Sequence, residues 1–141
     1  MKKTLFSLVV LLVCYSSFSQ KSIDSPDYGM SSIPGSLTKI ELTPEATIIH
    51  FHIKFKPGSW ISVPKESYIQ DVNGGEKIFV TKTEGIPLGK RYTMPESGEV
   101  SYQLYFPKLS STINKVDFGE ANKGGSWSIY DIVINEQETS L

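Results

Sequence analysis

The chain has 141 residues, of which 39% are hydrophobic and 21% are charged, and its formal net charge is −1. This length corresponds to a single domain that is long enough to bury a core. Charges of both signs are mixed along the chain, without the basic stripe of a nucleic-acid-binding domain or a polybasic membrane patch. We therefore expect no binding to DNA, RNA or anionic lipid through charge.

The first 19 residues have the form of a secretory signal peptide. Lys2 and Lys3 precede a short apolar run, which ends in a segment of small and polar residues. Ser17 and Ser19 are the small residues that place cleavage before Gln20. A retained anchor is the alternative, but the apolar run is shorter than the roughly 20 residues that span a bilayer. The sequence predicts a secreted or periplasmic protein without a transmembrane segment after removal of the signal.

Cys14 raises a second alternative, a lipoprotein that stays associated with the outer surface. A lipidated bacterial cysteine follows a small residue, whereas Val13 precedes Cys14 and the cysteine lies inside the apolar run. Because Cys14 is the one cysteine of the chain, its removal would leave a domain with no disulfide, thiol nucleophile or cysteine metal site.

The remaining chain divides into three parts. Residues 20–36 contain Ser, Pro, Gly and Asp without an apolar period and are predicted to be a flexible leader. Residues 37–135 are the predicted domain, and residues 136–141 are a polar tail.

The clearest strand of the domain covers residues 47–56. Its apolar residues alternate with polar ones, which is the two-residue period of a strand with one dry and one wet face. The dry face consists of Ile49, Phe51, Ile53 and Phe55, and the wet face of His50, His52, Lys54 and Lys56. Residues 37–42 alternate in the same way, and the turn at residues 43–46 predicts that the two strands form a hairpin.

Further strands follow at short, regular intervals. Asn73, Gly74 and Gly75 predict a second hairpin, because such turns need positive φ angles. The alternating residues 100–106 are predicted to lie across the core from the strand at residues 47–56. In residues 127–135 the alternation changes phase, which predicts a bulge near residues 129–131. The other predicted strands are residues 60–63, 68–72, 76–82, 90–94 and 115–119.

This pattern predicts an all-β fold. About seven or eight short strands, joined by Gly, Pro and Asn turns and without a long helical period, are typical of a sandwich or barrel. We favour a two-sheet antiparallel, immunoglobulin-like β-sandwich, and a partly closed β-barrel is the alternative.

Several motifs resemble those of a β-sandwich module of secreted bacterial proteins, which in larger relatives precedes a thioredoxin-like disulfide reductase domain. The similarity extends from about Thr38 to Val133. The motifs are residues 57–69, 85–88, 94–98, 104–109 and 116–120, followed by 127–130. They consist of turns, aromatic residues and strand ends, and the resemblance implies an exported accessory domain.

The chain departs from that family in features that bear on function. It has no Cys-x-x-Cys motif, so the resemblance does not imply redox activity. It reads Gly119-Glu120-Ala121-Asn122 and Tyr130-Asp131 where such modules often read Ile-Glu-Gly and Tyr-Gly. We therefore expect a stand-alone copy of the module.

His50 and His52 are the two histidines of the chain and point to the same face of one strand, about 6.5–7 Å apart. Two ligands fall short of the three or four that a metal site needs. A role as polar residues on the wet face is therefore favoured over a metal site, and no cofactor is predicted.

Large aromatic side chains are the other candidates for binding. Trp60, Tyr68, Tyr92 and Tyr105 could line a surface for a sugar or a protein, although such residues more often fill the core of a small sandwich. Tyr105 is the best of them, since its phase opposes that of the apolar residues in its strand.

The sequence contains no recognisable catalytic constellation. Glu66, Glu96, Glu99 and Glu120 could supply a carboxylate pair for glycoside hydrolysis, but no spacing brings two of them together. We therefore predict a non-enzymatic module that binds a partner protein or ligand through its loops and one sheet face. The alternative is a carbohydrate-binding or carbohydrate-active domain.

Overall fold

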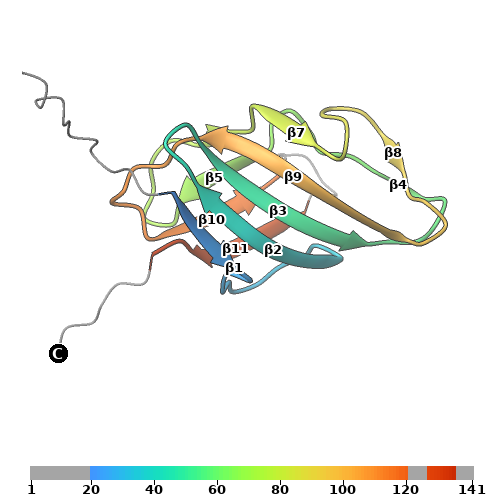
Figure 1. Ribbon diagram of the computed structural model, residues 1–141, viewed down its shortest axis with the longest axis horizontal. Coiled ribbons are helices and arrows are strands. Elements are labelled where there is room, and N and C mark those ends of the chain that lie inside the picture. Colours follow the sequence, from blue (N-terminus) through green and yellow to red (C-terminus); the bar gives the residue numbers. More distant parts are fainter. Residues whose placement is uncertain (1–19, 121–126, 136–141) are drawn as a thin grey trace, which may run out of the picture.

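The computed structural model describes residues 20–120 and 127–135, and these form an all-β fold of eleven strands (Figure 1). The predicted signal peptide, with Cys14, and the predicted polar tail lie outside the described residues. The strands are β1 (Lys21–Asp24), β2 (Gly35–Leu42), β3 (Ala46–Lys54), β4 (Trp60–Ile61), β5 (Tyr68–Asp71), β6 (Ile78–Phe79), β7 (Lys82–Glu84), β8 (Tyr92–Thr93), β9 (Glu99–Pro107), β10 (Lys115–Gly119) and β11 (Ser128–Val133). No helix in this part of the chain is long and apolar enough to cross a membrane.

The strands form two principal antiparallel sheets that pack against each other. The larger sheet has the order β1-β2-β3-β9-β7, and the smaller has the order β11-β10-β5-β6. The short strands β4 and β8 form a third, two-stranded sheet, which lies toward one end of the molecule (Figure 1). This arrangement confirms the predicted β-sandwich, and no closed barrel forms among the described strands.

The core lies between the two principal sheets. On β3, Ile49, Phe51 and Ile53 are buried, as the alternation predicts. The ring of Phe51 meets that of Phe118 on β10, with 5.3 Å between the ring centroids, so the two sheets are in direct contact. Each fully buried aliphatic or aromatic side chain contributes about 1.5–3 kcal/mol to the free energy of folding. Phe55, the fourth residue of the predicted dry face, is 38% exposed because β3 ends at Lys54.

The predicted position of residues 100–106 is wrong. These residues belong to β9, which pairs with β3 along its whole length within the same sheet and does not lie across the core from it. Ile49 is opposite Leu104, and Phe51 is opposite Tyr102. The alternation shows only which face of each strand is apolar. Two such strands can pair within one sheet or pack against each other from opposite sheets, and the pattern does not distinguish these arrangements.

The predicted strand at residues 76–82 is divided between the two principal sheets. Ile78 and Phe79 pair with β5, which confirms the hairpin around Gly74 and Gly75. The chain then crosses to the larger sheet, where Lys82–Glu84 pairs with β9. This crossing and several two-residue strands explain why the structure has more strands than the sequence predicts.

The predicted flexible leader, residues 20–36, is largely ordered by backbone hydrogen bonds. Residues Lys21–Asp24 form β1, the edge strand beside β2. The chain then runs along the free edge of β11, where Tyr130 N donates to Met30 O at 2.8 Å and Ser32 N to Ser128 O at 2.9 Å. This segment has few apolar residues because it lies at the edges of both sheets. It forms the edge strand β1 and then covers the edge of β11, and both positions face solvent.

The predicted bulge in the last strand is confirmed. Val116 is opposite Ile132 and Phe118 is opposite Ile129, so two residues of β11 face one residue of β10. Asp131 has a φ of 59°, and its N–H donates to the Asp117 carboxylate at 2.9 Å. The bulge keeps both Ile129 and Ile132 in the core although their spacing breaks the period of two.

Glu120 is a buried carboxyl group at the end of β10. It is 6% exposed, and its Oε1 accepts a hydrogen bond from Trp127 N at 3.0 Å. Burial raises the pKa of Glu120 from 4.5 to about 7, because it penalises the charged form more than this one hydrogen bond stabilises it. Burial and one backbone hydrogen bond thus determine the pKa of the Glu120 carboxyl group.

This carboxyl group should make stability depend on pH. Between pH 4.5 and about 7 the folded state retains a proton that the unfolded state has released, so the free energy of unfolding falls as pH rises through this interval. We expect a decrease of about 2–3 kcal/mol between pH 5 and pH 8, measured by urea denaturation. Glu120→Gln should remove most of the decrease, whereas Glu96→Gln, which alters an exposed residue, should retain it. An unchanged decrease in Glu120→Gln would contradict this assignment.

Candidate functional site

The outer face of the larger sheet carries both histidines. His50 Nε2 donates to Glu41 on β2 at 3.0 Å, and His52 Nε2 donates to Glu99 on β9 at 3.0 Å. Nδ1 of His52 is hydrogen-bonded to the hydroxyl of Ser101 at 2.7 Å. The hydrogen bond from His50 lowers the pKa of Glu41, and that from His52 lowers the pKa of Glu99.

This arrangement separates the two histidines. Each is paired with a different carboxylate, on the strand to one side of β3 or the other. Residues 20–120 and 127–135 contain no group of three His, Cys, Asp or Glu side chains that could hold a metal ion. The outer face is therefore an array of local polar pairs.

Two of the four aromatic candidates lie on the small third sheet. Trp60 is half exposed, and it is paired with Thr93, while Tyr92 is opposite Ile61. The guanidinium of Arg91 lies 4.3 Å from the centroid of the Trp60 ring. A cation thus covers one face of the most exposed of these rings.

The other two aromatic candidates lie on different sheets. Tyr68 is on the smaller sheet, with the ammonium of Lys77 at 4.3 Å from its ring centroid. Tyr105 is on the outer face of the larger sheet, with Lys82 at the same distance. The four aromatic residues therefore occupy three separate surfaces and do not form one aromatic platform.

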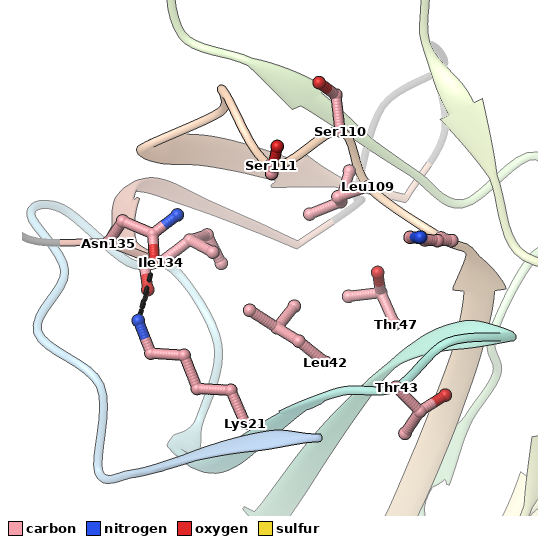
Figure 2. Close-up of a pocket in the computed structure, with 10 residues that line it drawn as sticks. Lys21, Leu42, Thr43, Thr47, Leu109, Ser110, Ser111, Ile134 and Asn135 are labelled. Carbon is pink, nitrogen blue, oxygen red and sulfur yellow. Dashed lines mark hydrogen bonds between the residues drawn. The ribbon is translucent and has the colours of Figure 1, made fainter. Parts of the chain in front are cut away.

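A pocket of about 230 Å³ lies at the end of the sandwich where the β2–β3 turn meets the loop after β9 (Figure 2). We call it the end pocket. Four separate segments form its wall: the start of β1, the β2–β3 turn, the β9–β10 loop and the residues after β11. Its lining residues are Lys21, Leu42, Thr43, Thr47, Lys108, Leu109, Ser110, Ser111, Ile134 and Asn135.

The walls of the end pocket are joined by hydrogen bonds of Asn135. Its side-chain oxygen accepts from Lys21 Nζ at 2.6 Å, the bond drawn in Figure 2, and its side-chain nitrogen donates to Ile113 O at 3.1 Å. Lys21 also donates to Ile134 O at 3.3 Å. The start of β1, the β9–β10 loop and the end of the domain are therefore held in a fixed relation.

Apolar side chains form the interior of the end pocket. Leu109 and Ile134 are buried, and Leu42 is partly buried against the same core. Figure 2 shows Leu42, Leu109 and Ile134 around the central space. An apolar interior with a few polar groups at fixed positions is the usual composition of a small-molecule site.

Thr47, a lining residue, has a buried hydroxyl without a hydrogen-bond partner among the described residues. The residue is 1% exposed. Figure 2 shows the hydroxyl directed toward the loop that carries Leu109. Leaving a buried hydroxyl unpaired costs about 1–3 kcal/mol, so a protein without a use for this oxygen would gain stability from an apolar residue here.

The end pocket combines an apolar interior with side chains that can donate hydrogen bonds. Its described lining residues include two lysines and four hydroxyl-bearing side chains, but no carboxylate, histidine or cysteine. It can enclose an apolar fragment and offer hydrogen bonds to it.

Sequence reasoning missed every residue of the end pocket. One signal was present, since Thr47 has the same phase as Ile49, Phe51 and Ile53 and is therefore a polar residue in an apolar row. The remaining lining residues come from segments far apart in the chain, and no local pattern indicates that they meet.

Comparisons with known proteins add no identity to this description. No family model, curated protein or solved structure matches the chain. The resemblance to the module that precedes reductase domains therefore stays a prediction, and the end pocket has to be interpreted from its own chemistry.

Replacing Thr47 tests whether its hydroxyl is indeed unpaired. Thr47→Val keeps the shape of the side chain and removes the oxygen, so we expect the free energy of unfolding to rise by about 1 kcal/mol. Thr83→Val is the matched control, because the Thr83 hydroxyl donates to Ile86 O at 2.6 Å and its loss should lower stability by about 1 kcal/mol. Urea denaturation of the two variants measures both changes. A loss of stability in Thr47→Val would show that the hydroxyl has a partner.

Proposed function

We propose that the protein is an exported, non-enzymatic β-sandwich module that binds a small ligand through the loops at one end of the sandwich. The end pocket carries this proposal, because its apolar interior lies beside polar side chains that hydrogen bonds hold at fixed positions. The export part rests on the N-terminal sequence alone.

The dimensions of the pocket support a small ligand. Its volume of about 230 Å³ exceeds the roughly 150 Å³ of an engineered cavity that binds benzene, and it is below the 300 Å³ or more of typical drug-sized sites. The ligand would be a single ring or a short chain of about eight carbon atoms, as judged from these volumes. Its walls are already joined through Asn135, so little ordering is needed on binding.

The alternative of carbohydrate binding receives less support. Sugar binding by stacking would need exposed rings that share one surface, and Trp60, Tyr68 and Tyr105 lie on three different ones. Each of these rings also has a cationic side chain on it. The outer sheet face, the other predicted contact surface, presents polar side chains that are paired with each other, and a partner would have to compete with those pairs.

Titration with 1-octanol, a neutral probe of suitable length, tests this proposal. We expect saturable binding with a Kd below about 1 mM, seen as amide shifts in ¹H–¹⁵N NMR spectra at residues 42–47, 108–111 and 134–135. Ser111→Trp places a large side chain at the mouth of the pocket and should abolish the shifts, because Ser111 is exposed and lines the pocket.

Lys56→Trp is the control for that variant. Lys56 is exposed and lies far from the end pocket, beyond the opposite end of β3, so its replacement should leave octanol binding unchanged. No saturable shifts with the unmodified protein, or equal binding by Ser111→Trp, would contradict the proposed function.

A further inference from the structure

We infer that the ligand of the end pocket is a small amphipathic anion, a carboxylate on a short apolar body. This inference rests on the proposed function and specifies the class of ligand. The apolar body would lie against Leu42, Leu109 and Ile134, and the carboxylate would lie at the lysine-bearing rim.

The charged side chains among the described lining residues of the end pocket are two lysines. Lys21 and Lys108 line the pocket, and none of the described lining residues is acidic. Glu45, in the β2–β3 turn, is the carboxylate nearest in sequence to Thr43 and Thr47, and it is exposed and does not line the pocket. The described lining residues thus contribute positive charge to the end pocket.

The ammonium of Lys21 is held in place by two neutral acceptors, and no carboxylate of the described residues is bonded to it. These acceptors are the Asn135 side-chain oxygen and Ile134 O, at 2.6 and 3.3 Å. An ammonium has three N–H donors, so one remains after these two bonds. A charge fixed in this way needs little reorganisation to meet an anion, and its hydrogen bond to a carboxylate is stronger than one between neutral groups.

Hydroxyl groups complete the rim. Ser110 and Ser111 are exposed and line the pocket on the loop that also carries Lys108. The loop is ordered by the bond between the hydroxyls of Ser110 and Thr112 at 2.9 Å and by Ile113 N donating to Ser110 O at 3.1 Å. A carboxylate accepts up to four hydrogen bonds, and lysine and serine are both donors to it.

A neutral ligand would gain no charge attraction from the lysines at the rim of the pocket. The apolar interior would bind the hydrocarbon chain of a neutral or a charged ligand, but only an anion is also attracted by the two exposed lysines at the rim. Such a contact is worth about tenfold in affinity over the uncharged analogue.

A comparison of octanoate with 1-octanol at pH 7.5 tests the inference, since the two probes share a chain length and differ in charge. We expect octanoate to bind the unmodified protein about tenfold more tightly. Raising the salt concentration from 20 mM to about 500 mM should weaken octanoate binding and leave octanol binding unchanged.

Variants that remove the charge of Lys21 and Lys108 test whether these side chains bind the carboxylate of octanoate. Lys108→Gln and the double variant Lys21→Gln with Lys108→Gln should weaken octanoate binding, the double variant to the level of 1-octanol. Octanol binding should change less than about twofold in each, which shows that the pocket is intact. Lys56→Gln, at the opposite end of β3, is the control and should behave as the unmodified protein.

Failure of the anionic ligand class and failure of the proposed function give different experimental results. Equal affinities for octanoate and 1-octanol, or octanoate binding that survives the double variant, would overturn the anionic class and leave the proposed function standing. Absence of binding by both probes would overturn both.

Discussion

The pairing of β3 with β9 is the interaction on which the rest of the structure depends. The two nine-residue strands pair in an unbroken register from Ala46 opposite Pro107 to Lys54 opposite Glu99. This register places both apolar rows on one face, where they meet the smaller sheet through Phe51 and Phe118. A slip of one residue would turn the apolar row of one strand toward solvent, so the register and the core define each other.

The same pairing determines the two surfaces that could carry function. On the outer face it places His52 beside Ser101 and Glu99, and these polar groups satisfy each other. At the end of the strands it places Thr47 in the inward row opposite Phe106, where the sheets are closed by loops. The two surfaces differ in hydrogen bonding. His52, Ser101 and Glu99 on the outer sheet face are bonded to each other, whereas the buried Thr47 hydroxyl has no partner among the described residues. The end pocket also has an apolar interior, and we propose it as the binding site.

Local patterns predicted the strands and the two hairpins at short turns, but not the pairing of strands far apart in the chain. The alternation of β3 and β9, the Gly74–Gly75 turn and the bulge at Asp131 are properties of short segments, and all were visible in the sequence. The pairing of β9 with β3, the crossing of the chain between β6 and β7 and the ordering of residues 21–34 depend on contacts between distant segments. The end pocket depends on such contacts entirely, because Lys21, Leu109 and Asn135 meet only in the folded chain.

The central claim is that an anionic chain occupies the end pocket. Intermolecular nuclear Overhauser effects between octanoate and the methyl groups of the protein test it most directly. The account predicts contacts from the octanoate chain to the methyl groups of Leu42, Leu109 and Ile134. Contacts that fall instead on Ile48 of the outer sheet face, or the absence of any contact to the three residues at saturating octanoate, would contradict it.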